Sequence, residues 1–266
     1  KISNFNLDLN SSRIEYNLIK KLWPKKSRPA ILSWMNKNLE NGYAEDISLK
    51  ANIINNEKET QNSNFLLSWL NKSASFSVFK DLPKAHLNEA LCQLTKTKLK
   101  VDVINLEIED IIINEGQIIV DNILSKNTEA SMKINFKEES KKILMKFDSP
   151  DLSLFKISNK DVEGIFNVEA TLNVPILSGI SIDNLKWKID AIGKNIKLHI
   201  SKYGLNIFNE LIKVEANNNE FVIKSMSNIN NDIFVNQKVE WIYKRILDNK
   251  PEILINFLKS SSLINF

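Results

Sequence analysis

The chain of 266 residues is 43% hydrophobic and 26% charged, a balance typical of folded proteins, and this excludes wholesale disorder. Its net charge of +4 arises from 36 basic and 32 acidic residues that are interleaved along the chain, so it does not indicate a nucleic-acid-binding surface. The single cysteine, Cys92, excludes an internal disulfide framework and a cysteine-rich zinc site, and we interpret it as a small, partly buried residue.

The first predicted element is a short amphipathic helix between Ser27 and Gly42. Pro29 suits the first turn of a helix, and Gly42 suits the position just beyond its end. The apolar residues of this segment recur at helical spacing: Ile31, Trp34, Met35 and Leu39. The segment 55–64, rich in Asn, Glu, Lys and Gln, is predicted to be a loop insertion.

The rest of the chain alternates apolar with polar residues, which is the pattern of half-buried β-strands. The apolar residues of two such stripes in the first half are Ile47, Leu49, Ala51 and Ile53, and then Leu99, Val101 and Val103. The second half carries Phe166, Val168, Ala170, Leu172 and Val174, and then Leu185, Trp187, Ile189 and Ala191. Shorter strands are predicted near 132–136, 143–147, 196–200 and 221–223. Polar pairs such as Asp121-Asn122 and Asn217-Asn218 are predicted to form the turns, because Asn and Asp tolerate a left-handed backbone and bond their own main chain.

The end of the chain has a different period. The apolar residues Val239, Ile242, Tyr243, Ile246 and Leu247 recur at helical spacing, and similar spacing follows Pro251. We therefore expect a β-rich region over 1–238, as one continuous sheet, and a helical tail over 239–266 that could be the edge of a following module.

No constellation of residues indicates catalysis. The two histidines, His86 and His199, lack a metal-ligand spacing, and we place His86 in a loop and His199 on the polar face of a strand. The six glycines are isolated, so there is no phosphate-binding loop, and no serine or cysteine sits in a nucleophile motif. The sequence therefore predicts a protein that is not an enzyme and uses no cofactor and no metal.

The predicted fold class is mainly β, with a long curled antiparallel sheet, a short helix near the N-terminus and the helical tail. Strands with one apolar face need a cover for that face. A second sheet would give a closed, sandwich-like core, whereas an open groove would expose the apolar stripes to a ligand such as lipid acyl chains. Periodicity leaves both alternatives open, so the stripes are candidate core or candidate lipid-facing residues.

Spaced landmarks over about residues 5–225 resemble the AsmA-like envelope family, in particular its YhdP- and TamB-type members. The landmarks include Leu22-Trp23-Pro24, Trp34, Gly42-Tyr43-Ala44, Gly116-Gln117-Ile118-Ile119-Val120 and Ile182-Asp183-Asn184-Leu185-Lys186-Trp187. The use of Asn and Lys where Gly or Arg is usual departs from the family pattern.

The resemblance implies a segment of a bridge-like lipid transfer protein that is anchored in the bacterial inner membrane and crosses the periplasm. Its implied partners are phospholipid acyl chains and other segments of the same longer polypeptide, with no nucleic acid. The chain has no secretory signal pattern and no run of about 18 apolar residues. We therefore expect any membrane contact to be made by regions outside it.

Overall fold

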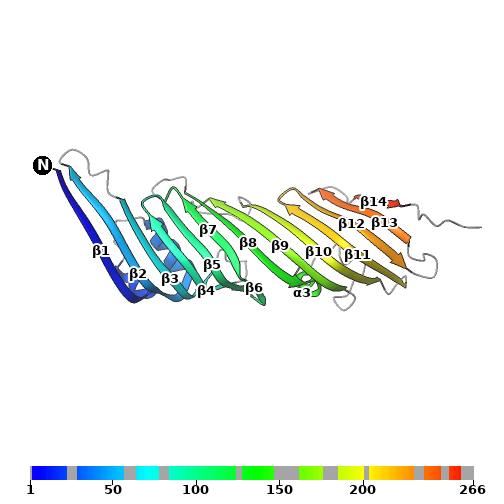
Figure 1. Ribbon diagram of the computed structural model, residues 1–266, viewed down its shortest axis with the longest axis horizontal. Helices are drawn as coiled ribbons and strands as arrows, with labels where there is room; N and C mark the ends of the chain where they lie inside the picture. Colours follow the sequence, from blue (N-terminus) through cyan, green and yellow to red (C-terminus); the bar gives the residue numbers. More distant parts are fainter. Residues whose placement is uncertain are drawn as a thin grey trace, which may run out of the picture. The chain divides into compact units, whose positions relative to one another are not determined.

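The computed structural model describes residues 2–22, 29–56, 64–77, 84–123, 128–146, 162–175, 185–200, 204–230, 237–246 and 252–258. These residues form a mainly β protein with one open antiparallel sheet of 14 strands (Figure 1). The strands pair in the order β1-β2-β3-β4-β5-β7-β8-β9-β10-β11-β12-β13-β14, and β6 pairs with β5. The order of the strands in the sheet therefore follows their order in the chain, except that β5 and β7 pair with each other and β6 lies off this path. Short connections favour such an order.

The strands of the first half are β1 (Ile2–Glu15), β2 (Leu39–Asn56), β3 (Asn64–Phe76), β4 (Ala85–Thr95), β5 (Lys98–Ile108), β6 (Ile111–Ile113), β7 (Glu115–Asp121) and β8 (Glu129–Glu139). Those of the second half are β9 (Val162–Pro175), β10 (Lys186–Ile200), β11 (Leu205–Asn217), β12 (Glu220–Asn230), β13 (Gln237–Ile246) and β14 (Glu252–Phe257). The described helices are α1 (Tyr16–Leu22), α2 (Pro29–Asn38) and α3 (Ser140–Lys146).

The chain divides into two compact units, which are described separately. Unit 1 comprises Lys1–Asn135 with Thr171–Lys186, and unit 2 comprises Phe136–Ala170 with Trp187–Phe266. In unit 1 the most deeply buried side chains are Ala90, Leu106 and Ile113. In unit 2 Val162, Ile196 and Ile212 form a buried cluster. Apolar side chains of neighbouring strands meet in both units because alternation places them on one face of the sheet.

Strand alternation is confirmed as the main organising pattern. The stripes at 47–53, 99–103, 166–174 and 187–191 lie in β2, β5, β9 and β10 respectively. The asparagine turns are confirmed as well. Asn122 has a φ of 55°, and the Asn217 side chain accepts hydrogen bonds from the backbone N–H groups of Asn219 (2.8 Å) and Glu220 (3.2 Å). The Asn217 side chain thus satisfies two backbone N–H groups of the β11–β12 turn.

The predicted helix is present as α2 but is shorter than the range 27–42. It ends at Asn38, and Gly42 lies inside β2 with a φ of 109°. A Cβ atom at Gly42 would lie 2.7 Å from the Cα atom of Ala74, so the close approach of β3 explains this glycine better than a helix end does. Residues 57–63 of the predicted loop lie outside the described residues.

The helical C-terminal tail was a wrong prediction, because residues 237–246 form β13 and residues 252–257 form β14. Val239, Trp241 and Tyr243 alternate along β13, and valine and aromatic residues favour strands. Val239 and Tyr243 are buried, which is the outcome of a period of two. The same segment also fits a helical period, so its sequence is compatible with a helix or a strand. It is a strand because it pairs with β12 and β14 in the sheet.

Two smaller predictions were also wrong. The strand predicted near 143–147 is instead the helix α3, whose Lys, Leu and Met residues are strong helix formers. Lys142 of this helix pairs with Glu138, four residues earlier at the end of β8, at 3.2 Å. His86 lies in β4 rather than in a loop.

Candidate functional site

The candidate functional site is a continuous row of apolar side chains on one face of unit 1. We call it the apolar row, and each member is the direct cross-strand partner of the next: Leu9, Leu49, Leu67, Leu94, Leu99, Val120 and Ala130. The row crosses seven strands, from β1 to β8, in strand order. With strands about 4.8 Å apart, its six steps give a length of about 29 Å.

Behind the apolar row, on the opposite face of the same strands, the side chains are mostly polar, although exposed Leu66, Leu91 and Ile104 lie elsewhere on that face. The row that lies one residue away along each strand comprises Asn10, Ser48, Ser68, Gln93, Lys100, Ile119 and Ser131. Only Ile119 is apolar in this second row. At the level of these two rows, strand pairing therefore places apolar side chains on one face of unit 1 and mostly polar side chains on the other.

Exposure of the apolar face changes along the strands. Every described side chain of the apolar row is at least partly accessible, and that of Leu9 is 53% exposed. Four residues away along the strands, Ala90, Val103 and Ile134 are buried in a second row, in which Gly116 separates Val103 from Ile134. The apolar face is therefore packed shut at one end and accessible at the other.

The helix α1 is hydrogen-bonded to the sheet at this buried end. The Tyr16 hydroxyl donates a hydrogen bond to the Asn71 Oδ1 atom on β3 at 2.5 Å, and it accepts one from the Trp69 indole N–H at 3.1 Å. Asn71 is 2% exposed, and its amide donates to the Leu87 carbonyl oxygen at 3.0 Å. Both the oxygen and the nitrogen of the Asn71 side chain are therefore hydrogen-bonded, and the bond to Tyr16 holds α1 against the sheet.

Unit 2 contains a second buried asparagine with the same kind of partners. Asn209 is 1% exposed and donates to the Ile196 carbonyl oxygen at 3.2 Å. Its Oδ1 atom accepts hydrogen bonds from the hydroxyls of Ser225 and Ser227, and the Trp241 indole N–H donates to Ser227 at 2.6 Å. We call Asn209, Ser225, Ser227 and Trp241 the Asn209 cluster. It lies next to the register shift at Asn209/Leu211.

The predicted stripe residues occupy different environments. Leu49 and Leu99 belong to the apolar row, whereas Val101 and Val103 are buried. The remaining residues in unit 1 are Ile47, Leu172 and Val174, which are half-buried, Leu185, which is buried, and Ile53, of which only the backbone is described. In unit 2, Phe166 and Ile189 are half-buried, Val168 is buried and Trp187 is exposed.

Five members of the apolar row were not among the predicted site residues: Leu9, Leu67, Leu94, Val120 and Ala130. The alternation of Phe5, Leu7 and Leu9 was a signal that could have identified Leu9. Leu67 gave no such signal. The sequence around it has apolar residues on both faces of the strand, so apolar and polar residues do not alternate there.

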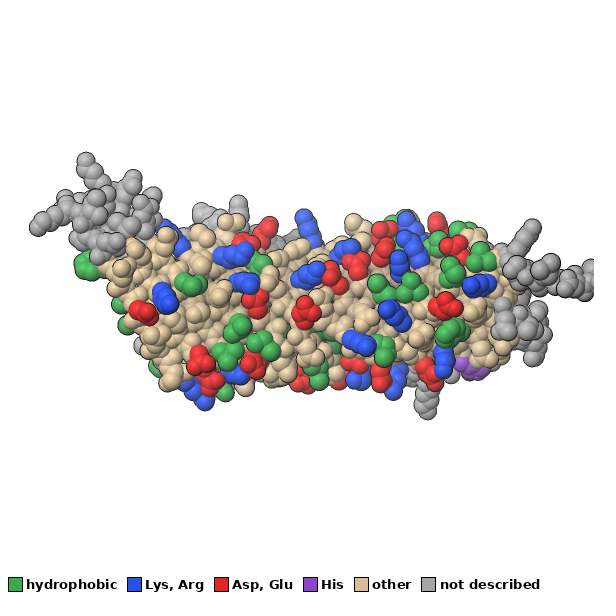
Figure 2. Space-filling view, in the orientation of Figure 1, with side chains coloured by type: hydrophobic (Ala, Val, Ile, Leu, Met, Phe, Trp, Pro, Cys, Tyr) green, Lys and Arg blue, Asp and Glu red, His purple; other side chains and the backbone are tan. Residues whose placement is uncertain are grey.

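The charged side chains balance one another locally. Figure 2 shows one face of the molecule, on which basic and acidic side chains are interleaved. On the polar face of unit 1, Lys100 lies 2.6 Å from Asp102 and Lys98 lies 3.5 Å from Asp121. The hydrogen bond from Lys100 holds the pKa of Asp102 below its ordinary value. Ion pairs of this kind add little stability but keep a polar surface soluble.

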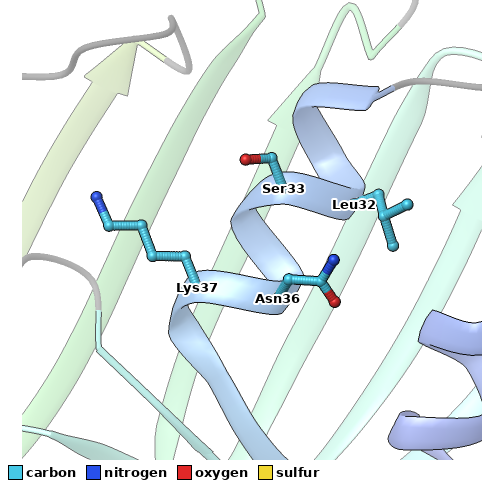
Figure 3. Close-up of a pocket in the computed structure, with 4 residues that line it drawn as sticks. All are labelled: Leu32, Ser33, Asn36 and Lys37. Atoms are coloured by element: carbon cyan, nitrogen blue, oxygen red, sulfur yellow. The ribbon is translucent and has the colours of Figure 1, made fainter.

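His86 of β4 lies beside Ser75 of β3. The His86 Nδ1 atom is 2.9 Å from the Ser75 hydroxyl, and the backbone N–H of Ser75 donates to Asn41 Oδ1 at 2.8 Å. A surface pocket is lined by Leu32, Ser33, Asn36 and Lys37, which all come from α2 and do not converge on one point (Figure 3). Among the residues that the structure describes, no three His, Cys, Asp or Glu side chains come together as a metal site would require.

Cys92 is 4% exposed, and burial, with a smaller effect of Asp102, raises the pKa of its thiol to about 12. Burial also raises the pKa of the Tyr16 phenol. Both groups are neutral when protonated, and burial favours the neutral form. Their contribution to the free energy of unfolding is therefore complete below their ordinary pKa values, about 9 for Cys92 and about 10 for Tyr16. It is lost as the pH rises further.

We therefore expect the free energy of unfolding to fall above about pH 9, by about 1.4 kcal/mol per pH unit for Cys92 alone. Denaturant titrations on both sides of that pH measure this fall. In Cys92→Ala the onset should move to about pH 10, where Tyr16 begins to titrate in the unfolded chain. The same alkaline slope in both proteins would contradict this assignment.

The fold and site define an open antiparallel sheet that carries an accessible apolar row on one face of unit 1. None of the helices in the described part of the chain is long and apolar enough to span a membrane. Comparison with family models, with curated proteins and with solved structures gave no match to the chain.

Proposed function

We propose that this chain is a segment of an AsmA-like envelope protein that shields or conducts phospholipid acyl chains between the inner and outer membranes. The observation that supports this proposal most is the apolar row, because seven strands in succession contribute a partly accessible apolar side chain to it. The landmarks that resemble the AsmA-like family support the same proposal.

A passive lipid groove needs a continuous apolar lining and a polar exterior, and it needs no nucleophile or metal. Removing apolar surface from water stabilises the bound state by about 25 cal/mol per Å². The row of leucines supplies such surface for a hydrocarbon chain, and the polar row on the opposite face supplies the exterior. The row runs across the strands, so an acyl chain bound along it would also lie across them.

In this proposal the segment works in the periplasm, as part of a protein that is anchored in the inner membrane by regions outside it. Its partners are phospholipid acyl chains and other segments of the same longer polypeptide. It acts without catalysis and without a cofactor, in line with the absence of a catalytic motif from the sequence.

One observation favours a second function, that of a structural or assembly module of the envelope with a closed core. Ala90, Val103 and Ile134 are buried, and α1 is hydrogen-bonded to β3 at Asn71, so part of the apolar face is already packed. If other regions of the longer protein pack the apolar row in the same way, the face contributes stability and conducts no lipid.

Purification without detergent, followed by solvent extraction and mass spectrometry, tests the lipid proposal. We expect phospholipid to be retained by the protein. Photo-cross-linking residues introduced singly at Leu49, Leu67 and Leu99 should label that lipid, because these side chains lie in the accessible row.

The matched controls are Lys50, Ser68 and Lys100, which follow the three test positions in the chain and point to the opposite face. We expect at least about tenfold less lipid labelling from them, since a strand separates the two faces. Equal labelling from both sets, or no retained phospholipid, would contradict the proposal and favour the structural module.

A further inference from the structure

Trp69 of β3 lies where the accessible apolar row meets the buried end of the same face. It follows Leu67, a member of the row, by two residues, so both side chains lie on one face of the sheet. Its direct partner on β4 is Cys92, which is 4% exposed, and the next residue in this line is Val101 on β5, which is 8% exposed. Trp69 itself is half-buried. Its indole ring therefore borders the row on the side where the face closes.

Tyr16, the first residue of α1, holds this ring in place. The Trp69 indole N–H donates to the Tyr16 hydroxyl at 3.1 Å, and that hydroxyl donates to Asn71 Oδ1 at 2.5 Å. Burial, and then the charge of the nearby Cys92, raise the pKa of the Tyr16 phenol, so Tyr16 lies beside Cys92 as well. The N–H is the only polar group of an indole, and with this bond made the rest of the ring offers hydrocarbon to a neighbour.

A polar turn limits the row on its other side. Leu94 and Leu99 are the last pair of the β4–β5 hairpin, and the turn 95–98 follows. In this turn the Thr95 hydroxyl accepts a hydrogen bond from the Lys98 N–H at 3.1 Å and donates one to the Lys98 carbonyl oxygen at 3.2 Å. At this hairpin the accessible apolar lining is therefore one side-chain row wide, which is about 7 Å along the strands.

We propose that Trp69 contacts the acyl chain bound on the apolar row and limits the row at the β4–β5 hairpin to one chain. Trp69 is then a specificity-determining residue, and Tyr16 is a positioning residue that acts through it. The inference rests on the proposed function and narrows its ligand. A second acyl chain beside the first would have no apolar lining beneath it, so a single-chain lipid such as stearic acid fills this part of the row.

The aromatic ring suits this role because it is large, apolar and already held. A tryptophan side chain offers a wide hydrocarbon surface and has few torsions to fix when a ligand binds. The bond to Tyr16 orders the ring before binding, and such preorganisation lowers the entropy cost of the contact.

Fluorescence quenching tests the contact in the 266-residue chain. The probe is stearic acid with two bromine atoms in the middle of its chain, supplied below its micelle-forming concentration, because bromine quenches tryptophans that it touches. Unbrominated stearic acid is the control. We expect the brominated chain to quench a component of the emission that Trp69→Phe lacks, while both proteins bind stearic acid with similar affinity in calorimetry. Equal quenching of the two proteins would overturn the proposal.

The natural Cys92 reports whether the ring limits the row. In the wild-type chain this thiol is buried and should react slowly with N-ethylmaleimide. Trp69→Ala removes the ring, so alkylation should become several-fold faster, and stearic acid should slow it again by filling the space. Trp69→Phe, which keeps an aromatic ring, is the matched control and should react about as slowly as the wild type. Fast alkylation of Trp69→Ala that stearic acid does not slow would overturn the proposal, since the ring would then cover the thiol without bordering the ligand.

Tyr16→Phe keeps both rings and removes only the hydroxyl, so it tests the positioning of Trp69. Alkylation of Cys92 should be faster than in the wild type and slower than in Trp69→Ala, and stearic acid should slow it. This milder variant also takes the place of Trp69→Ala if circular dichroism shows that the alanine variant does not fold. A wild-type alkylation rate in Tyr16→Phe would overturn the positioning role.

The failure of this inference can be distinguished from the failure of the proposed function. A photo-cross-linking residue at Leu67 reports phospholipid on the row without involving the Trp69 ring. Labelling from Leu67 together with an unquenched Trp69 would overturn the inference alone. Absence of both labelling and quenching would overturn the inference and the proposed function together.

Discussion

Replacing Asn209 by alanine should lower the free energy of unfolding by about 3 kcal/mol, as measured by denaturant titration. The side chain is 1% exposed, so its hydrogen bonds have no water to replace them. Its loss leaves the Ile196 carbonyl oxygen without the amide donor and removes the acceptor shared by Ser225 and Ser227. Each buried polar group that loses its partner costs about 1–3 kcal/mol.

Asn206→Ala is the matched control. It removes an asparagine from the same strand, but the side chain is exposed and is bonded to His199, itself exposed, at 2.7 Å. We expect a change within about 0.5 kcal/mol, the range of most surface substitutions. If the two variants proved equally stable, the Asn209 cluster would contribute little to unit 2.

The strands of this protein were predictable where one face is apolar and the other is polar. The stripe at Phe166–Val174 in β9 and the stripe at 99–103 in β5 have a period of two that no helix can match. The segment that became β13 fits both periods. It forms a strand because it pairs with β12 on one side and β14 on the other. Such pairing depends on the rest of the fold and cannot be read from the segment alone.

The candidate site was predictable only in part, for a related reason. Leu49 and Leu99 stood out because their strands alternate cleanly, but Leu67 and Leu94, which join them into a row, did not. A row across a sheet depends on register, and the bulges near Leu87 and Glu89 shift it in β4. The buried role of Asn71 was not predictable, because its hydroxyl partner Tyr16 lies 55 residues away.

A pair of aspartate substitutions on β5 separates an open lipid groove from a closed core. Val103 is 5% exposed, so Val103→Asp buries a carboxylate and should destabilise the protein by about 4 kcal/mol or unfold it. Leu99 lies four residues earlier on the same face, in the partly accessible apolar row. An aspartate there keeps contact with water, so Leu99→Asp should cost no more than about 1 kcal/mol.

The two functions then differ in one measurement on the folded Leu99→Asp protein, which is the amount of phospholipid that it retains. A charge in the lining of a groove repels hydrocarbon, because the carboxylate keeps its water, so retention should fall several-fold while the melting temperature changes little. Leu99→Asn, which is uncharged and of similar size, should lose less lipid than the aspartate variant. If Leu99→Asp instead unfolds the protein as Val103→Asp does, the row is packed in the folded state and the closed structural module is the better description.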